Sequence, residues 1–147
     1  KFGIVEDAKI VQQKLKLYCD VPLKKGDILI VCGDFGFVWE LEGTREYIRE
    51  KIKSPKWFIF SDDIEWCRKE FSGLADAVFI SGNQDAPLED MHLMSACKHH
   101  IIANSTFSWW GAFLGEENGV VVYPDPWFRD VVIPRTCVPK DWYALSF

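Results

Sequence analysis

"IIANSTFSWWGAFL", residues 101–114, contains two different patterns in direct succession. An apolar run ends at Ala103 and is followed by small or polar residues with one Phe among them: Asn104, Ser105, Thr106 and Ser108. Two tryptophans and further apolar residues come next. This order predicts a buried strand over 100–103, a polar turn, and a helix over 108–114. A hydrophobic core needs no hydroxyl or amide groups here, so the turn is a candidate for ligand binding.

The same alternation of strand and helix extends along the chain. Short apolar runs predict strands over 28–32, 57–60, 77–80, 100–103 and 120–123. Helical spacing and capping residues predict helices over 4–18, 44–52, 88–98 and 108–114, and one after Asp63 that includes Lys69. Such an alternation forms βαβ units, so we expect a three-layer α/β domain with a mainly parallel sheet and the 28–32 strand at one edge. The proline-containing segment after Tyr123 is expected to be irregular and to cover the sheet.

The composition excludes several classes of protein. A length of 147 residues with 48% hydrophobic residues fits one globular domain. A net charge of −5, with no basic cluster longer than two residues, argues against nucleic acid or an anionic membrane as partner. The chain has neither an apolar run near the ~20 residues of a membrane span nor the regions of a signal peptide.

Five cysteines without a C-x-x-C pair predict reduced thiols in a cytoplasmic protein rather than disulfides or zinc ligands. Because residue 1 is Lys and not Met, we expect a piece of a longer polypeptide.

Polar residues follow three of the predicted strands where each one ends. They are the segments 61–63, 82–85 and 104–106. In a parallel α/β sheet, ligands bind where strands end and helices begin. Backbone amides at a helix start can hold a phosphate group without a basic field. The three segments therefore indicate a site for a nucleotide at one edge of the sheet.

The sequence resembles one enzyme family in three segments. These are "KWFIFSDDIEWCRKEF" (56–71), "LEDMHLMSACKHHIIANSTFSWWGAFL" (88–114) and "VVVYPDPWF" (120–128). Through them, residues 44 to about 142 resemble the C-terminal part of the α-1,2-fucosyltransferases, glycosyltransferase family 11. The resemblance implies one Rossmann-like lobe of a GT-B architecture, binding GDP-fucose over 44–147, with residues 1–43 of uncertain origin. It also implies transfer of fucose to the 2-hydroxyl of a galactose-containing glycan, with inversion and without a metal or other cofactor.

The resemblance also implies roles for individual residues. Asp90 matches a position expected to read guanine, and Ser105 and Thr106 match positions expected near the diphosphate. Physical chemistry agrees, because one carboxylate can accept both adjacent N–H donors of guanine and so reject adenine. A turn before a helix can hold a diphosphate through its free N–H groups and hydroxyls. The predicted substrate-binding residues are Asp62, Asp63, Asp90, Asn104, Ser105, Thr106, Phe107 and Ser108, and no metal ligand is predicted.

Each of these residues also has a simpler structural interpretation. Asp90 could be a helix N-cap, and one of the pair Asp62 and Asp63 could cap the helix that follows them. The hydroxyl residues at 105–106 could likewise be capping residues. We expect His99 and His100 to pack around a strand rather than bind a metal, because no third ligand stands at metal spacing. Trp109 and Trp110 are expected to contact the core and a neighbouring lobe rather than a sugar. The sequon at 104–106 is expected to lie in an inward loop rather than carry a glycan.

Part of the family pattern is absent from this sequence. The family carries a His-x-Arg-Arg-x-Asp motif whose arginine is thought to stabilise the leaving diphosphate, and no two arginines are adjacent here. Loss of one such electrostatic contact commonly costs ~3 kcal/mol of transition-state stabilisation. The acceptor-binding lobe is also missing, so we expect a missing N-terminal lobe as partner and little transfer by this chain alone. A non-catalytic GDP-binding module is therefore an alternative.

A second, weaker resemblance concerns the segment "LKKGDILIVCGDFGFVWE" (23–40). It is similar to a strand and loop of the calcineurin-like metallophosphoesterases, in which Asp34 would be a metal ligand. The Asp-x-His and Gly-Asn-His-Glu motifs of that family are absent, and residues 82–85 read Gly-Asn-Gln-Asp. A dinuclear site needs several His and carboxylate ligands, and the chain has three His. A metallophosphoesterase remnant is therefore the last alternative.

Overall fold

The computed structural model describes residues 28–31, 50–53, 55–74, 77–83, 85–115, 119–127 and 137–146. Three sequence predictions lie outside these residues: the helix over 4–18, most of the helix over 44–52, and the site of Asp34. Among the described residues, no helix has the length and apolar composition needed to cross a membrane.

The described strands form one parallel six-stranded sheet in the order β3-β2-β1-β4-β5-β6. Their bounds are β1 Ile28–Val31, β2 Trp57–Phe60, β3 Ala77–Ile80, β4 His99–Ile101, β5 Val121–Asp125 and β6 Tyr143–Ser146. Every predicted strand is therefore confirmed, with bounds that differ by a few residues. The parallel sheet is confirmed as well.

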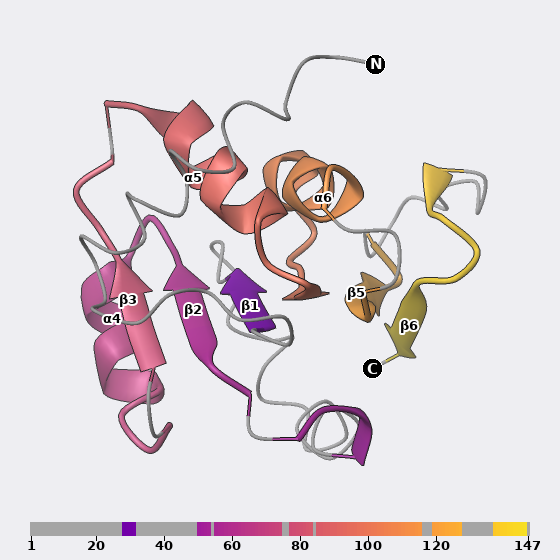
Figure 1. The fold of residues 1–147 in the computed structure, drawn as a ribbon, viewed down its shortest axis with the longest axis horizontal. Helices are drawn as coiled ribbons and strands as arrows, with labels where there is room; N and C mark the ends of the chain where they lie inside the picture. Colours follow the sequence, from indigo (N-terminus) through magenta and orange to yellow (C-terminus); the bar gives the residue numbers. More distant parts are fainter. Residues whose placement is uncertain are drawn as a thin grey trace.

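The position of β1 differs from the prediction. We expected the 28–32 strand at an edge, but β1 lies in the middle of the sheet and pairs with β2 on one side and β4 on the other. An all-apolar strand suits this place, because central parallel strands are covered on both faces. The edges are β3 and β6 (Figure 1). The edge strand β6, after Pro139, was not predicted, because the proline-containing C-terminal region was expected to be irregular.

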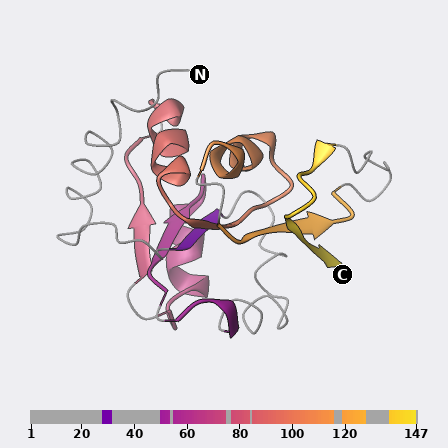
Figure 2. The same ribbon diagram turned by 45° about the vertical axis from the view of Figure 1, so that its right-hand side comes forward.

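The described helices cover both faces of the sheet. They are α4 Ile64–Glu70, α5 Pro87–Ser95 and α6 Thr106–Phe113. Figure 2 shows α5 and α6 over one face and α4 over the other. The predicted three-layer arrangement is thus confirmed for this part of the chain. The helix α6 begins at Thr106, two residues earlier than predicted, so part of the polar turn belongs to its first turn.

The core follows from the alternation of side chains along β2. All four residues of β2 are buried. Its second and fourth residues pack toward α5, in a cluster formed by Phe58, Phe60, Ile80, Leu93, Met94 and Cys97. Its first and third residues belong to the cluster that includes α4 and the far strands: Ile52, Trp57, Ile59, Cys67, Phe71, Ile101, Val122 and Leu145. Because successive strand residues point to opposite faces, one strand supports both helical layers.

A glycine allows α5 and α6 to pack closely against each other. A Cβ atom at Gly111 of α6 would lie 2.8 Å from Cβ of Met94 and 2.9 Å from its sulfur. Both residues are buried. The absence of a side chain at Gly111 therefore fixes the distance between the two helices. It also fixes where the first turn of α6 lies relative to α5.

The strand order determines where a ligand would bind. The order 3-2-1-4-5-6 is that of doubly wound sheets, in which the chain runs outward in one direction from β1 and in the other from β4. The switch point of the strand order therefore lies between β1 and β4. In such sheets the ligand crevice lies at this point, outside the carboxyl ends of the strands. The turn from β4 into α6, which the sequence predicted as a site, follows one of the two strands at this switch point.

Candidate functional site

The first turn of α6 offers backbone donors next to the switch point between β1 and β4. Ser105 is the N-cap residue, in extended conformation (φ −119°, ψ 131°), and its side chain makes no capping hydrogen bond. The first N–H groups of a helix have no partner within the helix. Thr106, the first residue of α6, is exposed. The N–H groups of this turn are thus left without a side-chain cap, and the helix dipole adds partial positive charge to them.

Ser108 holds this turn in place from inside. Its side chain is fully buried, and its hydroxyl lies 3.2 Å from the carbonyl oxygen of Ala103 and 3.0 Å from that of Ser105, to which it can donate. The hydroxyl therefore connects the end of the strand to the N-cap. The structure places Ser108 behind the turn, unlike the partly exposed Asn104 and Ser105.

Phe107 anchors the same turn to the core. It is partly buried and packs against the cluster formed by β2, β3 and α5. An aromatic side chain that is held in this way limits how far the turn can move. The polar run at 104–108 thus divides into two parts. Asn104, Ser105 and Thr106 are accessible, and the two residues after them support the turn.

Asp90 lies in the first part of α5, next to a buried amide. The side-chain nitrogen Nδ2 of Asn83 donates to Oδ1 of Asp90 at 2.7 Å. The N-cap of α5 is Ala86, so the interpretation of Asp90 as an N-cap is wrong. Burial raises the pKa of Asp90 above its usual value, the hydrogen bond from Asn83 opposes that rise, and neighbouring Glu89 adds to it. Asp90 is therefore a partly buried carboxylate with a single hydrogen-bond donor among the described residues.

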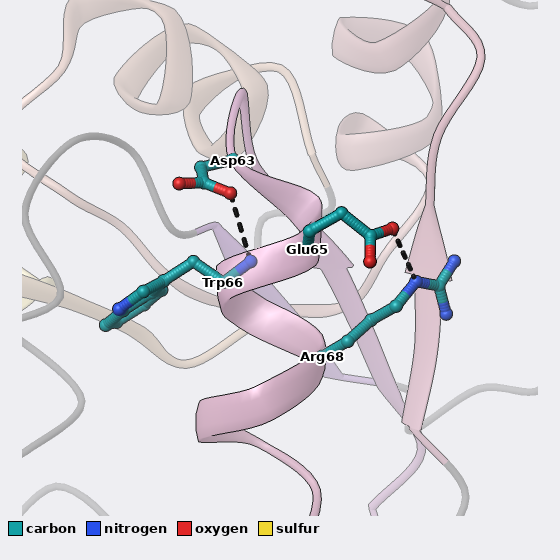
Figure 3. A network of polar contacts seen from close by, with 4 residues as sticks. All are labelled: Asp63, Glu65, Trp66 and Arg68. Atoms are coloured by element: carbon teal, nitrogen blue, oxygen red, sulfur yellow. Dashed lines mark hydrogen bonds and ion pairs between the residues drawn. The ribbon is translucent and has the colours of Figure 1, made fainter.

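Asp62 and Asp63 have local partners at the start of α4. Oδ1 of Asp63 accepts a hydrogen bond from the backbone N–H of Trp66 at 3.0 Å, which makes Asp63 the N-cap of α4 (Figure 3). Oδ1 of Asp62 accepts one from the N–H of Asp63 at 3.1 Å. The capping interpretation is thus confirmed for Asp63, and ligand contact by Asp62 stays a prediction. Figure 3 also shows the exposed ion pair between Arg68 and Glu65, whose atoms lie 3.5 Å apart.

The structure brings Asp90 and the α6 turn to the same edge and face of the sheet. The helix α5 follows β3 and α6 follows β4, and both helices cover one face (Figure 1). The strands β3 and β4 are separated by β2 and β1, which corresponds to ~14 Å across the sheet. Asp62 and Asp63 precede the helix on the opposite face. Asp90 and residues 104–108 thus lie at one edge and toward one face of the sheet, whereas Asp62 and Asp63, at the same edge, lead into the helix of the other face.

The histidines of β4 have structural partners. Nδ1 of His99 accepts a hydrogen bond from the N–H of Val120 at 2.9 Å, and Nε2 of His100 lies 3.1 Å from the carbonyl oxygen of Cys97. Burial lowers the pKa of both imidazoles, that of His100 to about 4. Burial thus favours the neutral form of both side chains, and their contacts confirm the packing interpretation. In the described part of the chain, no group of three or more His, Cys, Asp or Glu residues could hold a metal ion.

The tryptophans of α6 differ in their surroundings. Trp109 stacks on Phe113 with ring centroids 4.7 Å apart and contacts Trp142 at 5.7 Å. It packs against the small core cluster of Ile102, Ala112 and Val121. Trp110 is 47% exposed. The core contact predicted for Trp109 is confirmed, and Trp110 lies on the outer surface of α6.

The position of Asn83 was not predicted from the sequence. The segment 82–85 was recognised as polar, but no pattern indicated that its amide would contact Asp90 seven residues later. The signal that could have found it is Gly82 directly after a strand. Gly82 adopts a positive φ of 92°, which turns the chain so that the following residue is buried.

Comparison with known proteins identifies the family. A family profile described as glycosyl transferase family 11 matches residues 20–144, and the chain therefore belongs to that family. An α-1,2-colitosyltransferase of Escherichia coli is 49% identical over 106 residues, which cover 68% of this chain and 36% of that protein. Galactoside 2-α-L-fucosyltransferase SEC1 of Bos taurus is 30% identical over 145 residues, which cover 88% of this chain and 38% of that protein. No solved structure matches.

The matches show how much of its relatives' length this chain covers and where the family match begins. The chain spans about a third of the length of these relatives. The family match begins at residue 20, well before residue 44, where the resemblance was expected to begin. The segment 23–40, which was compared with metallophosphoesterases, lies within this match, and its strand β1 is central in the common sheet.

Proposed function

We propose that this chain is the donor-binding part of an α-1,2-fucosyltransferase with GT-B architecture. In this proposal it binds GDP-fucose, and fucose passes to the 2-hydroxyl of a galactoside with inversion. Membership of family 11 and the names of the relatives support this. The observation that carries the proposal is the first turn of α6, which has no side-chain cap and lies next to the switch point, on the same edge and face as Asp90.

The two parts of the site would bind the two ends of the nucleotide. Asp90 would accept hydrogen bonds from N1–H and N2–H of guanine, a pattern that adenine lacks. The N–H groups of the first turn of α6 and the hydroxyls of Ser105 and Thr106 would hold the diphosphate. Developing negative charge on the leaving GDP would be stabilised by donors that are already oriented, because Ser108 and Phe107 fix the turn from behind.

The proposed role is donor binding rather than complete catalysis. The chain spans about a third of its relatives, and it lacks the His-x-Arg-Arg-x-Asp motif. We therefore propose that a separate lobe supplies the acceptor site and the cation at the leaving group. Without that lobe, the chain acts as a GDP-binding module. We also propose a cytoplasmic site of action, which the five cysteines without a C-x-x-C pair favour.

The donor sugar is a separate question from the nucleotide. One relative is named for colitose and others are named for fucose. The proposed contacts of Asp90 and the α6 turn involve only GDP, so they would be the same for either sugar. Fucose is our proposal, and comparison of GDP-fucose with GDP-colitose in a binding assay tests it.

Titration calorimetry tests the proposed nucleotide site. GDP should bind in the presence of EDTA, ADP should bind more weakly, and Asp90→Asn should reduce the difference, because one acceptor becomes a donor that faces a donor. The matched control is Asp85→Asn, an exposed acid in the loop before α5, which should change nothing. Equal affinity of the wild-type protein for GDP and ADP would contradict the proposal.

A further inference from the structure

A buried amide lies at the point where the chain turns from β3 into α5. Gly82, with φ of 92°, redirects the chain after the strand, and Asn83 follows with only 9% of its surface exposed. The backbone carbonyl of Asn83 accepts a hydrogen bond from the N–H of Ala86 at 2.8 Å, which closes the turn before the helix. The backbone of this loop therefore places the side chain of Asn83 beneath the first part of α5.

The side chain of Asn83 is directed at one carboxylate. Its Nδ2 donates to Oδ1 of Asp90 at 2.7 Å, a short contact of the kind seen when the acceptor is charged. A buried amide loses its hydration and needs such a partner. Among the described residues, Oδ2 of Asp90 accepts no hydrogen bond. The carboxylate is thus held by one oxygen while the other remains available.

We infer that Asn83 is a positioning residue that orients Asp90 to accept the paired N–H donors of a guanine base. This inference rests on the proposed function and adds a determinant of nucleotide specificity to it. A carboxylate has about four acceptor positions. One of those on Oδ1 is used by Asn83, and the remaining position on Oδ1 and both on Oδ2 can accept the N1–H and N2–H donors. Adenine, which lacks this pair of donors, would gain nothing from the orientation.

The same contact favours the ionised form of Asp90. Burial raises the pKa of Asp90, and among the described residues Glu89 is the charged group that raises it further, while the hydrogen bond from Asn83 lowers it. Removal of the amide should therefore raise the pKa of Asp90. A protonated carboxyl carries one donor and can no longer accept both hydrogen bonds from guanine. The loss of GDP binding on acidification should accordingly begin at a higher pH in a variant without Asn83.

A double-mutant cycle separates positioning from a general structural effect. Calorimetry would measure the affinity for GDP and ADP of the wild-type protein, Asn83→Ala, Asp90→Asn and the double variant. Asn83→Ala should reduce the preference for GDP roughly tenfold, as expected for loss of a hydrogen bond to a charged group. In the Asp90→Asn background the same change should reduce it no further. An equal loss in both backgrounds would overturn the inference.

Two further readouts distinguish the possible failures. A carbon-13 NMR titration of Asp90, without any nucleotide, should show a higher pKa in Asn83→Ala than in the wild-type protein, and Asp85→Asn serves as the control. An unchanged pKa would overturn the inference. If the wild-type protein prefers GDP and Asn83→Ala keeps the full preference, the inference fails and the proposed function stands. If the wild-type protein shows no preference for GDP, the proposed function and the inference both fail.

Discussion

His100 should make the stability of the protein strongly dependent on pH in the acidic range. It lies in β4 with 2% of its surface exposed, and its Nε2 is 3.1 Å from the carbonyl oxygen of Cys97. Its Nδ1 is buried without a hydrogen-bond partner in the described part of the chain. Burial lowers the pKa of the imidazole from 6.5 to about 4, because the charged form would have to be accommodated without water.

The sign and the size of the effect follow from this shift. Above pH 6.5, the unfolded pKa, the imidazole is neutral in the folded and in the unfolded protein. As the pH falls from 6.5 to about 4, the folded pKa, the unfolded chain binds a proton that the folded protein does not bind, so the free energy of unfolding decreases. The difference between the unfolded and the folded pKa corresponds to roughly 3 kcal/mol, at ~1.36 kcal/mol per pKa unit. At pH 4, where half of the folded molecules would be protonated at this site, the loss should be about 3 kcal/mol.

Urea unfolding at pH 7 and pH 4 measures this loss. The test compares the wild-type protein with His100→Gln, in which the amide can still donate to the carbonyl of Cys97 but does not titrate. The control is His92→Gln, which replaces a partly exposed histidine on α5. Between pH 7 and pH 4, the free energy of unfolding should decrease in all three proteins. The decrease in His100→Gln should be smaller than in the other two proteins by about 3 kcal/mol. Equal losses in all three proteins would refute the assignment of His100 as a buried neutral imidazole.

Three further variants test the supports of the site. Gly111→Ala should lower the free energy of unfolding by about 1–3 kcal/mol through overpacking, because the new Cβ would lie 2.8 Å from a Met side chain of α5. Gly73→Ala, where nothing lies within 4 Å, is the control, and equal melting temperatures would contradict the close packing. Asp63→Ala should cost about 1 kcal/mol in urea unfolding through loss of the α4 cap, and Asp62→Ala should cost less. Ser108→Ala should weaken GDP binding in calorimetry, because the hydroxyl that connects the strand end to the N-cap is lost; unchanged affinity would show that the turn does not need it.

Local patterns predicted the elements well, because the patterns and the elements extend over the same few residues. Four apolar residues in a row at 57–60 indicated a buried strand, and the structure has β2 over the same residues. The polar turn after β4 was placed at the correct edge of the sheet, since all strands are parallel. Its residues could not be divided into accessible and supporting ones. That division depends on how α6 packs against α5 through Gly111.

Order in the sheet was harder to predict than the elements themselves. The central place of β1 results from pairing with β2 and with β4, whose residues are about 30 and 70 positions away in sequence. No local pattern contains that information, and an all-apolar strand is compatible with several positions. The contact between Asn83 and Asp90 spans only seven positions, and the one local signal for it was the glycine at position 82, which turns the chain after β3. Capping of α4 by Asp63, in contrast, is local and was among the predicted alternatives.

Amide chemical shifts in nitrogen-15 NMR, recorded with GDP in the presence of EDTA, show whether the first turn of α6 and Asp90 bind GDP together. We expect the largest changes at the amides of Thr106, Phe107 and Ser108, with smaller changes around Asp90 and none at the α4 cap, Asp63. Saturation with GDP that leaves residues 106–108 unshifted, or that shifts the start of α4 instead, would show that GDP binds elsewhere.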